Sequence, residues 1–221
     1  MALADPRLDR VVRFDERSRS YPIRTLIAQP APITRTWRCT TYLDQGQEGA
    51  CVGYSIAHEL AARPIEITAT SDLAHDIYDR ARQIDEWPGE DYEGTSVLAG
   101  MKAAREFGYF REYRWAFGLN DLMLAVSFHG PAVLGVPWYE GMLEPDNHGY
   151  IHPTGEVVGG HAILCRGLNV RRGYFYLHNS WGQSWGPLAG ACTIRFEDLD
   201  RLLHEQGEAC IPVGRLRPTA A

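Results

Sequence analysis

The sequence lacks the features that would tie a chain to a membrane. No apolar run approaches the ~20 residues that a helix needs to cross a bilayer. Residues 1–20 are charged throughout and have none of the apolar character of a secretory signal. Lysine is scarce too, since Lys102 is the only one, and the 22 basic residues are outnumbered by 28 acidic ones, which gives a net charge of −6. We therefore expect a cytoplasmic protein whose partner is neither a nucleic acid nor a membrane.

Cysteine is sparse and is not arranged in pairs. The five cysteines are odd in number, and no two of them form a C-x-x-C motif. This excludes a disulfide framework and indicates a reducing compartment. Cys165 and Cys192 stand in apolar segments and are expected to be core thiols, whereas Cys39 and Cys210 stay undecided.

The periodicity of the apolar residues changes along the chain. Helical spacing predicts helices over the following segments: residues 51–62, 72–84, 97–107 and 121–128. Short apolar or alternating segments predict strands in the second half: residues 131–138, 161–169, 173–181 and 192–196. The chain is therefore expected to be α+β, with helices first and strands later.

The length and this order predict two lobes that share a cleft. The 221 residues suffice for one large domain or two small lobes. We divide the chain into an N-terminal arm (residues 1–35), a helical lobe (36–118) and a β-rich lobe (119–221), which together form one domain.

Three residues predict thiol chemistry. Cys51 follows a Gly-rich loop and opens a helix, where unpaired N–H groups and the helix dipole favour a thiolate. His161 opens an apolar segment after two glycines and can act as the proton donor and acceptor. Asn179 ends a predicted strand, and its amide can hold His161 in one tautomer and rotamer.

The motifs around these residues resemble those of the papain-like cysteine peptidases. Residues 45–51 read QGQEGAC, with glutamine and cysteine six residues apart as in that family. Gly160-His161-Ala162 resembles its histidine strand, and residues 179–186 match its NSWGxxWG signature. The resemblance covers residue 36 to the end. It implies a helical lobe and a β-barrel-like lobe with the active site between them.

The resemblance also implies roles for single residues. The implied catalytic residues are Cys51 as nucleophile, His161 as acid and base, Asn179 as orienting group and Gln45 as oxyanion donor. The resemblance further implies that Gly94 pairs with the backbone of a bound peptide and that Trp181 shields the His161–Asn179 hydrogen bond. We count Gly160 with these two as substrate-binding residues.

The sequence departs from the family pattern in several places. Glu48 stands where the family has a cysteine, and Val52 replaces the usual tryptophan. The distances along the chain, 161 − 51 = 110 and 179 − 51 = 128 residues, are shorter than the family's typical ~130–150. The chain therefore resembles compact bacterial or phage members, and its specificity cannot be copied from larger ones.

The N-terminal arm is too short and too interrupted by proline for the helical pro-region of secreted relatives. We expect it to brace the two lobes rather than to inhibit the site. The acidic run at residues 85–94 is expected to be a solvated loop that could favour basic groups on a substrate.

Two other kinds of site are rejected. Residues 182–186 fit G-x-S-x-G, but Pro187 and a strand-like segment follow, where a serine hydrolase requires a helix. His148 and His152 have a zinc-like spacing, but they lie in a Gly/Pro-bearing loop that would not align them. We expect no metal and no cofactor.

The favoured function is therefore hydrolysis of a peptide or protein substrate by a cysteine peptidase. One alternative is a transpeptidase or amidase that acts on a non-protein or cell-wall peptide. Another is a catalytically idle module that only binds peptides. A binding module has no need for Gln45, Cys51, His161 and Asn179 together, so the sequence favours an enzyme.

Overall fold

A computed structural model describes residues 5–85 and 93–216 of the chain. Most of the acidic run at residues 85–94 lies outside this part. Within the described ranges, no helix combines the length and the apolar character needed to span a bilayer.

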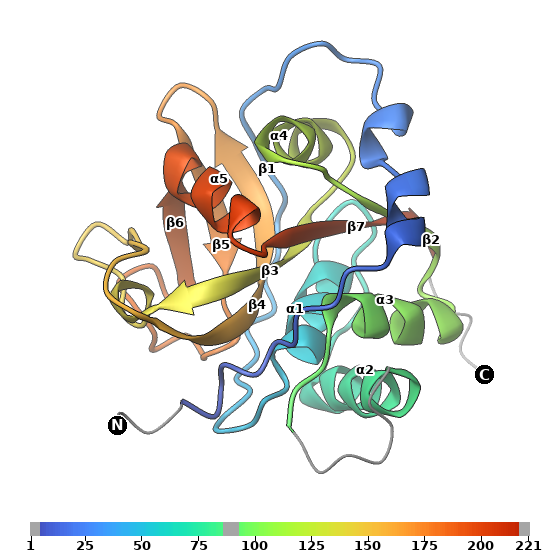
Figure 1. The fold of residues 1–221 in the computed structure, drawn as a ribbon, viewed down its shortest axis with the longest axis horizontal. Coiled ribbons are helices and arrows are strands. Elements are labelled where there is room, and N and C mark those ends of the chain that lie inside the picture. The colour runs from blue at the N-terminus through green and yellow to red at the C-terminus, as the bar shows by residue number, and fades with distance from the viewer. Residues whose placement is uncertain (1–4, 86–92, 217–221) are drawn as a thin grey trace.

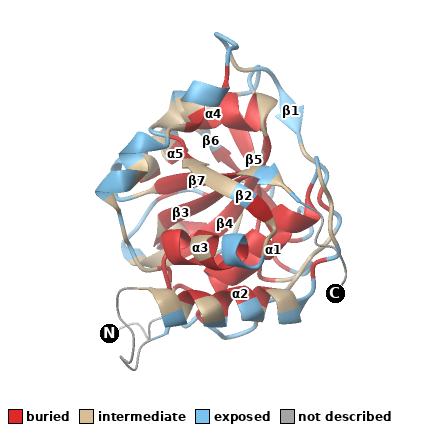
Figure 2. Ribbon diagram, turned by 90° about the vertical axis from the view of Figure 1, so that its right-hand side faces the viewer, coloured by how far each residue is buried: buried red, intermediate tan, exposed pale blue. Residues whose placement is uncertain are grey.

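Three helices form the first lobe: α1 (Cys51–Ala61), α2 (Ser71–Ile84) and α3 (Val97–Glu106). Their positions confirm the first three predicted helices. Side-chain caps start two of them, because Thr70 accepts a hydrogen bond from the Leu73 N–H and Ser96 accepts one from the Ala99 N–H. Every residue of α1 is buried, whereas the outer face of α2 is exposed (Figure 2). Helix α1 is thus the central helix.

An antiparallel sheet dominates the second half (Figure 1). Its strands in spatial order are β2 (Phe110–Trp115), β7 (Glu208–Arg215), β3 (Ala132–Tyr139), β4 (Val157–Asn169), β5 (Tyr174–His178) and β6 (Ala191–Arg195), and β1 (Arg35–Thr36) pairs with β4. Two longer helices accompany the sheet: α4 (Leu119–Phe128) and α5 (Phe196–His204). Three short 3₁₀ helices are η1 (Glu16–Ser20), η2 (Ile23–Leu26) and η3 (Glu140–Met142).

The sequence analysis found only part of this sheet. The predicted helix at 121–128 and the four predicted strands are confirmed, although β4 begins four residues earlier than expected, at Val157. The remaining elements were not predicted: the strands β1, β2 and β7, the helix α5 and the short 3₁₀ helices η1, η2 and η3. The α+β class is confirmed.

Two apolar clusters form the core. One contains α1, α2 and α3, and the other lies on the opposite side of the sheet beneath α4 and α5. The helical cluster also includes residues of the sheet such as Ala162 and Cys210, and the other cluster includes Leu8 and Ile23 of the arm, so neither cluster is bounded at the expected residue 118. Because β2 precedes this point and yet belongs to the sheet, the division of the chain into lobes stays a prediction.

Helices α1 and α2 approach each other closely at Gly53. A Cβ at this position would lie 2.2 Å from the carbonyl oxygen of Ala74 and 2.9 Å from the Cβ of Tyr78. Glycine is therefore required here by backbone contact with α2.

We predict that Gly53→Ala lowers the free energy of unfolding by about 1–3 kcal/mol, because the new methyl group forces the two helices apart. Urea denaturation measures this change. Gly130→Ala is the matched control, since the nearest atom to its Cβ would be Pro64 Cδ at 3.9 Å. Equal stability of the two variants would contradict the close contact.

Candidate active site

Cys51 is the first residue of α1, and its side chain is fully buried. The preceding residue, Ala50, gives no side-chain cap, so the first turn of the helix keeps its N–H groups for other partners. The backbone N–H of Ala162 on β4 donates a hydrogen bond to Cys51 Sγ at 3.4 Å. The thiol therefore lies directly beside the strand that carries His161.

His161 and Asn179 come together across neighbouring strands. Leu164 of β4 pairs with His178 of β5, and this register brings the residue after His178 toward His161. Asn179 Oδ1 lies 2.8 Å from His161 Nε2. Because the amide oxygen is an acceptor, this contact requires the proton on Nε2 and leaves Nδ1 as the free ring nitrogen.

Two tryptophans enclose the imidazole of His161. The ring centroid of Trp181 lies 4.9 Å from that of His161, and the centroid of Trp138 lies 4.6 Å away. Both indoles are buried. Trp181 therefore lies beside the imidazole, and its shielding role stays a prediction. The sequence analysis missed Trp138, because its apolar segment signalled only a strand.

Gln45 is held beside this pair by the loop that carries Asn179. The backbone N–H of Gln45 donates to the Ser180 carbonyl at 2.9 Å, and Ser180 Oγ donates to Gln45 Oε1 at 2.6 Å. With its oxygen bound, the side-chain amide points Nε2 toward the carbonyls of Glu48 (2.6 Å) and Arg7 (3.3 Å). Gln45 thus presents an N–H donor to a carbonyl of the arm.

Part of the N-terminal arm fills the cleft between the lobes. We call residues 7–11 the cleft segment. The Arg10 N–H donates to the Gly160 carbonyl at 3.0 Å, and the Gly160 N–H donates to the Leu8 carbonyl at 3.3 Å. On the other side, the Val11 N–H donates to the Thr95 carbonyl at 3.0 Å. The segment therefore pairs with both lobes (Figure 1).

Both predicted substrate-binding glycines touch the cleft segment. A Cβ on Gly94 would lie 1.8 Å from the Asp9 carbonyl oxygen, and one on Gly160 would lie 2.3 Å from the Arg10 carbonyl oxygen. Gly94 also has φ +89°, which disfavours other residues. Trp181 is covered as well, because the Arg7 guanidinium carbon lies 4.0 Å from its ring centroid.

The expectation that the arm only braces the lobes is therefore incomplete. The cleft segment links the lobes, but it also covers Cys51 and His161, and both are 0% exposed. The sequence analysis did not expect the arm to cover the site, because residues 1–35 show no helical pattern like that of a pro-region. The cleft segment covers the site in an extended conformation. A search for helical periodicity in the sequence does not detect such a segment.

Burial makes the thiol and the imidazole neutral in this arrangement. It raises the pKa of Cys51 to about 11, although the Ala162 N–H lowers it. Burial lowers the pKa of His161 to about 4, although the bond to Asn179 raises it. The expected thiolate is thus not favoured while the cleft segment is in place, because desolvation outweighs the helix N-terminus.

The residues of the two other motifs considered in the sequence analysis lie in turns and loops. The segment after Ser184 forms turns up to Gly190 and then enters β6, so no helix follows the serine. His152 Nε2 forms a local hydrogen bond with Asp146 Oδ2 at 3.0 Å. Within the described ranges, no three histidine, cysteine or acidic side chains are arranged to hold a metal ion.

The comparisons with known proteins find similarity to cysteine proteinases. No family model matches the chain. It is 23% identical over 153 residues to cathepsin B-like cysteine proteinase 4 of Caenorhabditis elegans, covering 63% of the chain and 43% of that relative. It is 38% identical over 75 residues to a cathepsin B-like cysteine proteinase of Schistosoma japonicum, covering 33% and 22%. The chain thus matches less than half the length of these relatives.

Solved structures of cysteine proteases share the fold. Xylellain, a cysteine protease from Xylella fastidiosa, has a TM-score of 0.64 at 19% identity, covering 97% of this chain and 94% of that one. ProCathepsin B S9 from Trypanosoma congolense has a TM-score of 0.65 at 16% identity, covering 95% and 83%. The fold implied by the sequence motifs is confirmed.

We predict that the His161 imidazole stays neutral in the intact chain until the pH falls toward 4. Its pKa is lowered to about 4, so the unfolded chain takes up a proton below pH ~6.5 before the folded chain does. Stability is therefore lost as the pH falls from about 6.5 to 4. Nitrogen NMR of labelled histidine measures the titration, and a midpoint near 6.5 would contradict the burial.

Proposed function

We propose that this chain, which resembles the papain-like cysteine peptidases in fold and in sequence, hydrolyses peptide bonds through Cys51. The observation that carries the proposal is the grouping of four side chains from distant parts of the chain. Cys51 lies against the backbone next to His161, His161 is bonded to Asn179 at 2.8 Å, and Gln45 presents its amide N–H to a peptide carbonyl. A hydrophobic core with no catalytic or binding role would not bury these polar groups together, because removing each of them from water costs free energy.

In the proposed reaction His161 takes the proton of the Cys51 thiol, and the sulfur attacks the carbonyl carbon of the substrate. The resulting oxyanion accepts hydrogen bonds from Gln45 Nε2 and the Cys51 backbone N–H. His161 then gives its proton to the leaving amine, and water hydrolyses the thioester to regenerate the thiol. Asn179 keeps the imidazole in the tautomer that this exchange requires.

The same acyl-enzyme could pass its acyl group to an amine instead of water, which is the transpeptidase alternative. Mass spectrometry of the products in the presence of an added amine separates the two, because efficient aminolysis identifies a transferase. A binding module would form no acyl-enzyme in either case.

We predict that Cys51→Ala lowers the cleavage of peptide substrates by about a thousandfold or more, because no other thiol reaches His161. The cleft segment covers Cys51, so the assay uses the Arg10→Ala chain as well as the wild type, because this change removes the buried ion pair of Arg10 with Glu208 that holds the segment. Fluorogenic peptide libraries supply the substrates.

Cys165→Ala is the matched control. Cys165 is also a buried thiol, but it stands on β4 and lies in the core cluster on the other side of the sheet from Cys51. Cleavage that survives in the Cys51→Ala variant would contradict the proposed nucleophile. Absence of cleavage in every form of the chain would contradict the proposed function.

We predict that Gln45→Ala lowers kcat about 10²–10³-fold with a smaller change in KM, because the lost donor acts mainly on the transition state. Steady-state kinetics on one peptide measures both values. Ser180→Ala is the control, since it removes a partner of Gln45 Oε1 and leaves Nε2 in place. Equal losses in the two variants would indicate that Gln45 has only a structural role.

A further inference from the structure

One buried histidine of α1 is not used by the proposed reaction. His58 is 0% exposed and stands about two helical turns after Cys51. Burial lowers the pKa of His58 well below its ordinary value, so the ring is neutral and one of its nitrogens can accept a hydrogen bond. A polar ring at this depth costs free energy unless it is hydrogen-bonded. His58 therefore needs a partner inside the protein.

The partner of His58 is the backbone of the loop that carries Gln45. The Leu43 N–H donates a hydrogen bond to His58 Nε2 at 2.9 Å. Because Nε2 accepts, the proton of the neutral ring is on Nδ1. Cys39, which precedes the same loop, places its Sγ 3.5 Å from the His58 carbonyl oxygen. Two contacts thus join residues 39–43 to the middle of α1.

The loop is also bonded to the segment that follows Asn179. The Gly182 N–H donates to the Leu43 carbonyl at 3.4 Å, and the Gln45 N–H donates to the Ser180 carbonyl at 2.9 Å. Leu43 is therefore held from two directions, through its carbonyl by residues 180–182 and through its N–H by α1. The bond to His58 relates the position of the Gln45 loop to the position of the helix that begins at Cys51.

The ring of His58 is held in one orientation by a stack of rings. Its centroid lies 4.5 Å from that of His178, with the planes at 64°. Tyr42 stacks on the other ring at 4.5 Å and 29°. Burial lowers the pKa of His178 to about 4, so both imidazoles are neutral and pack without charge repulsion. The stack joins α1, the end of β5 and the loop that carries Gln45.

We propose that His58 is a positioning residue, whose Nε2 holds the Leu43 N–H and thereby keeps Gln45 beside the first turn of α1. In the proposed function, Gln45 Nε2 and the Cys51 backbone N–H donate to the same oxyanion, yet they belong to different segments. Two donors can serve one oxygen only if the loop and the helix keep a fixed distance. This catalytic role rests on the proposed function, whereas the contact between His58 and Leu43 does not.

The first experiment tests the contact without any substrate. Nitrogen NMR of the full chain, labelled at histidine, should show His58 with its proton on Nδ1 and His161 with its proton on Nε2. Hydrogen exchange of the Leu43 amide is then compared between His58→Gln and His58→Leu chains. Glutamine supplies an acceptor oxygen and leucine supplies none, so exchange should be at least about tenfold faster in the leucine variant.

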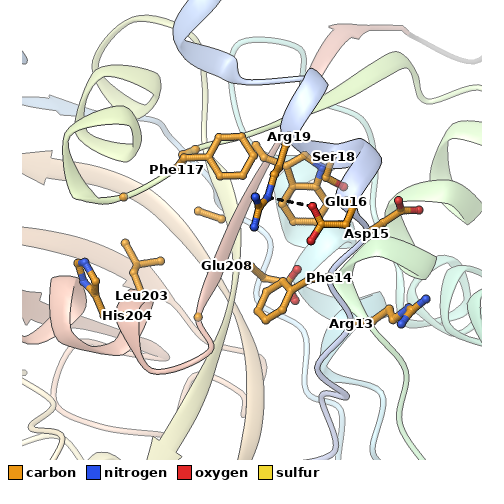
Figure 3. Close-up of a pocket in the computed structure, with 15 residues that line it drawn as sticks. Arg13, Phe14, Asp15, Glu16, Ser18, Arg19, Phe117, Leu203, His204 and Glu208 are labelled. Atoms are coloured by element: carbon orange, nitrogen blue, oxygen red, sulfur yellow. Dashed lines mark ion pairs between the residues drawn. The ribbon is translucent and has the colours of Figure 1, made fainter.

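His204→Leu is the matched control for this exchange. His204 lines a pocket of about 520 Å³ between residues 13–19 and the sheet, and its side chain is 75% exposed (Figure 3). Loss of this histidine should leave the exchange of the Leu43 amide unchanged. Equal exchange in the two His58 variants would overturn the proposed hydrogen bond, and so would a neutral His58 that carries its proton on Nε2.

The second experiment tests the catalytic role in the Arg10→Ala chain with a fluorogenic peptide. His58→Leu should lower kcat at least about tenfold with a smaller change in KM, because a displaced oxyanion donor acts mainly on the transition state. His58→Gln should keep kcat within about threefold of the parent chain, since it retains an acceptor for the Leu43 N–H. Equal losses of kcat in the two variants would contradict the positioning role.

A double-mutant cycle separates an effect through Gln45 from a general loss of structure. If His58 acts through Gln45, adding His58→Leu to a Gln45→Ala chain should lower kcat by less than about twofold further. Losses that multiply in the double variant would overturn the proposed role. If no form of the chain cleaves a peptide, the proposed function fails, and the NMR and exchange results by themselves support or overturn the bond between His58 and the loop.

Discussion

The packing of α1 against β4 is the contact on which the rest of the structure depends. Ala162 and Leu164 of β4 lie in the apolar cluster of the helices, whereas Ile163 and Cys165 lie in the cluster on the other face of the sheet. Because successive side chains of a strand point to opposite faces, one strand serves both cores. Its position is therefore determined by burial on two sides. The Ala162 N–H then meets Cys51 Sγ at 3.4 Å as a consequence of that packing.

Exclusion of water gives the site its present electrostatic state. Two indoles and the cleft segment surround the imidazole, and in such surroundings both a thiolate and an imidazolium are costly. The hydrogen bonds of His161 and Cys51 oppose this effect without overcoming it. The Arg10–Glu208 pair belongs to the same enclosure, since each charge compensates the burial of the other. The arm thus covers a site whose polar groups are neutral or paired.

The sequence predicted helices α1 to α4 and strands β3 to β6, and among the longer elements it missed β2, β7 and α5. Helices α1, α2 and α3 were found because their apolar residues follow one helical period. Strand β7 contains Pro212 and Gly214, which weaken a strand signal, and β2 is mostly half-buried and polar. Helix α5 has only nine residues and follows directly on β6, so its short pattern was absorbed into the end of a strand.

By itself the sequence determined the α+β class, and it named Gln45, Cys51, His161 and Asn179 as a candidate group. These follow from local periodicity and from short motifs, which need no knowledge of distant contacts. Only the tertiary structure decided that the arm lies in the cleft and that Arg10 meets Glu208, 198 positions further along the chain. An arginine in a charged, irregular segment has the pattern of a solvated residue. Its burial depends on a carboxylate that the folded sheet, and not the local sequence, brings to it.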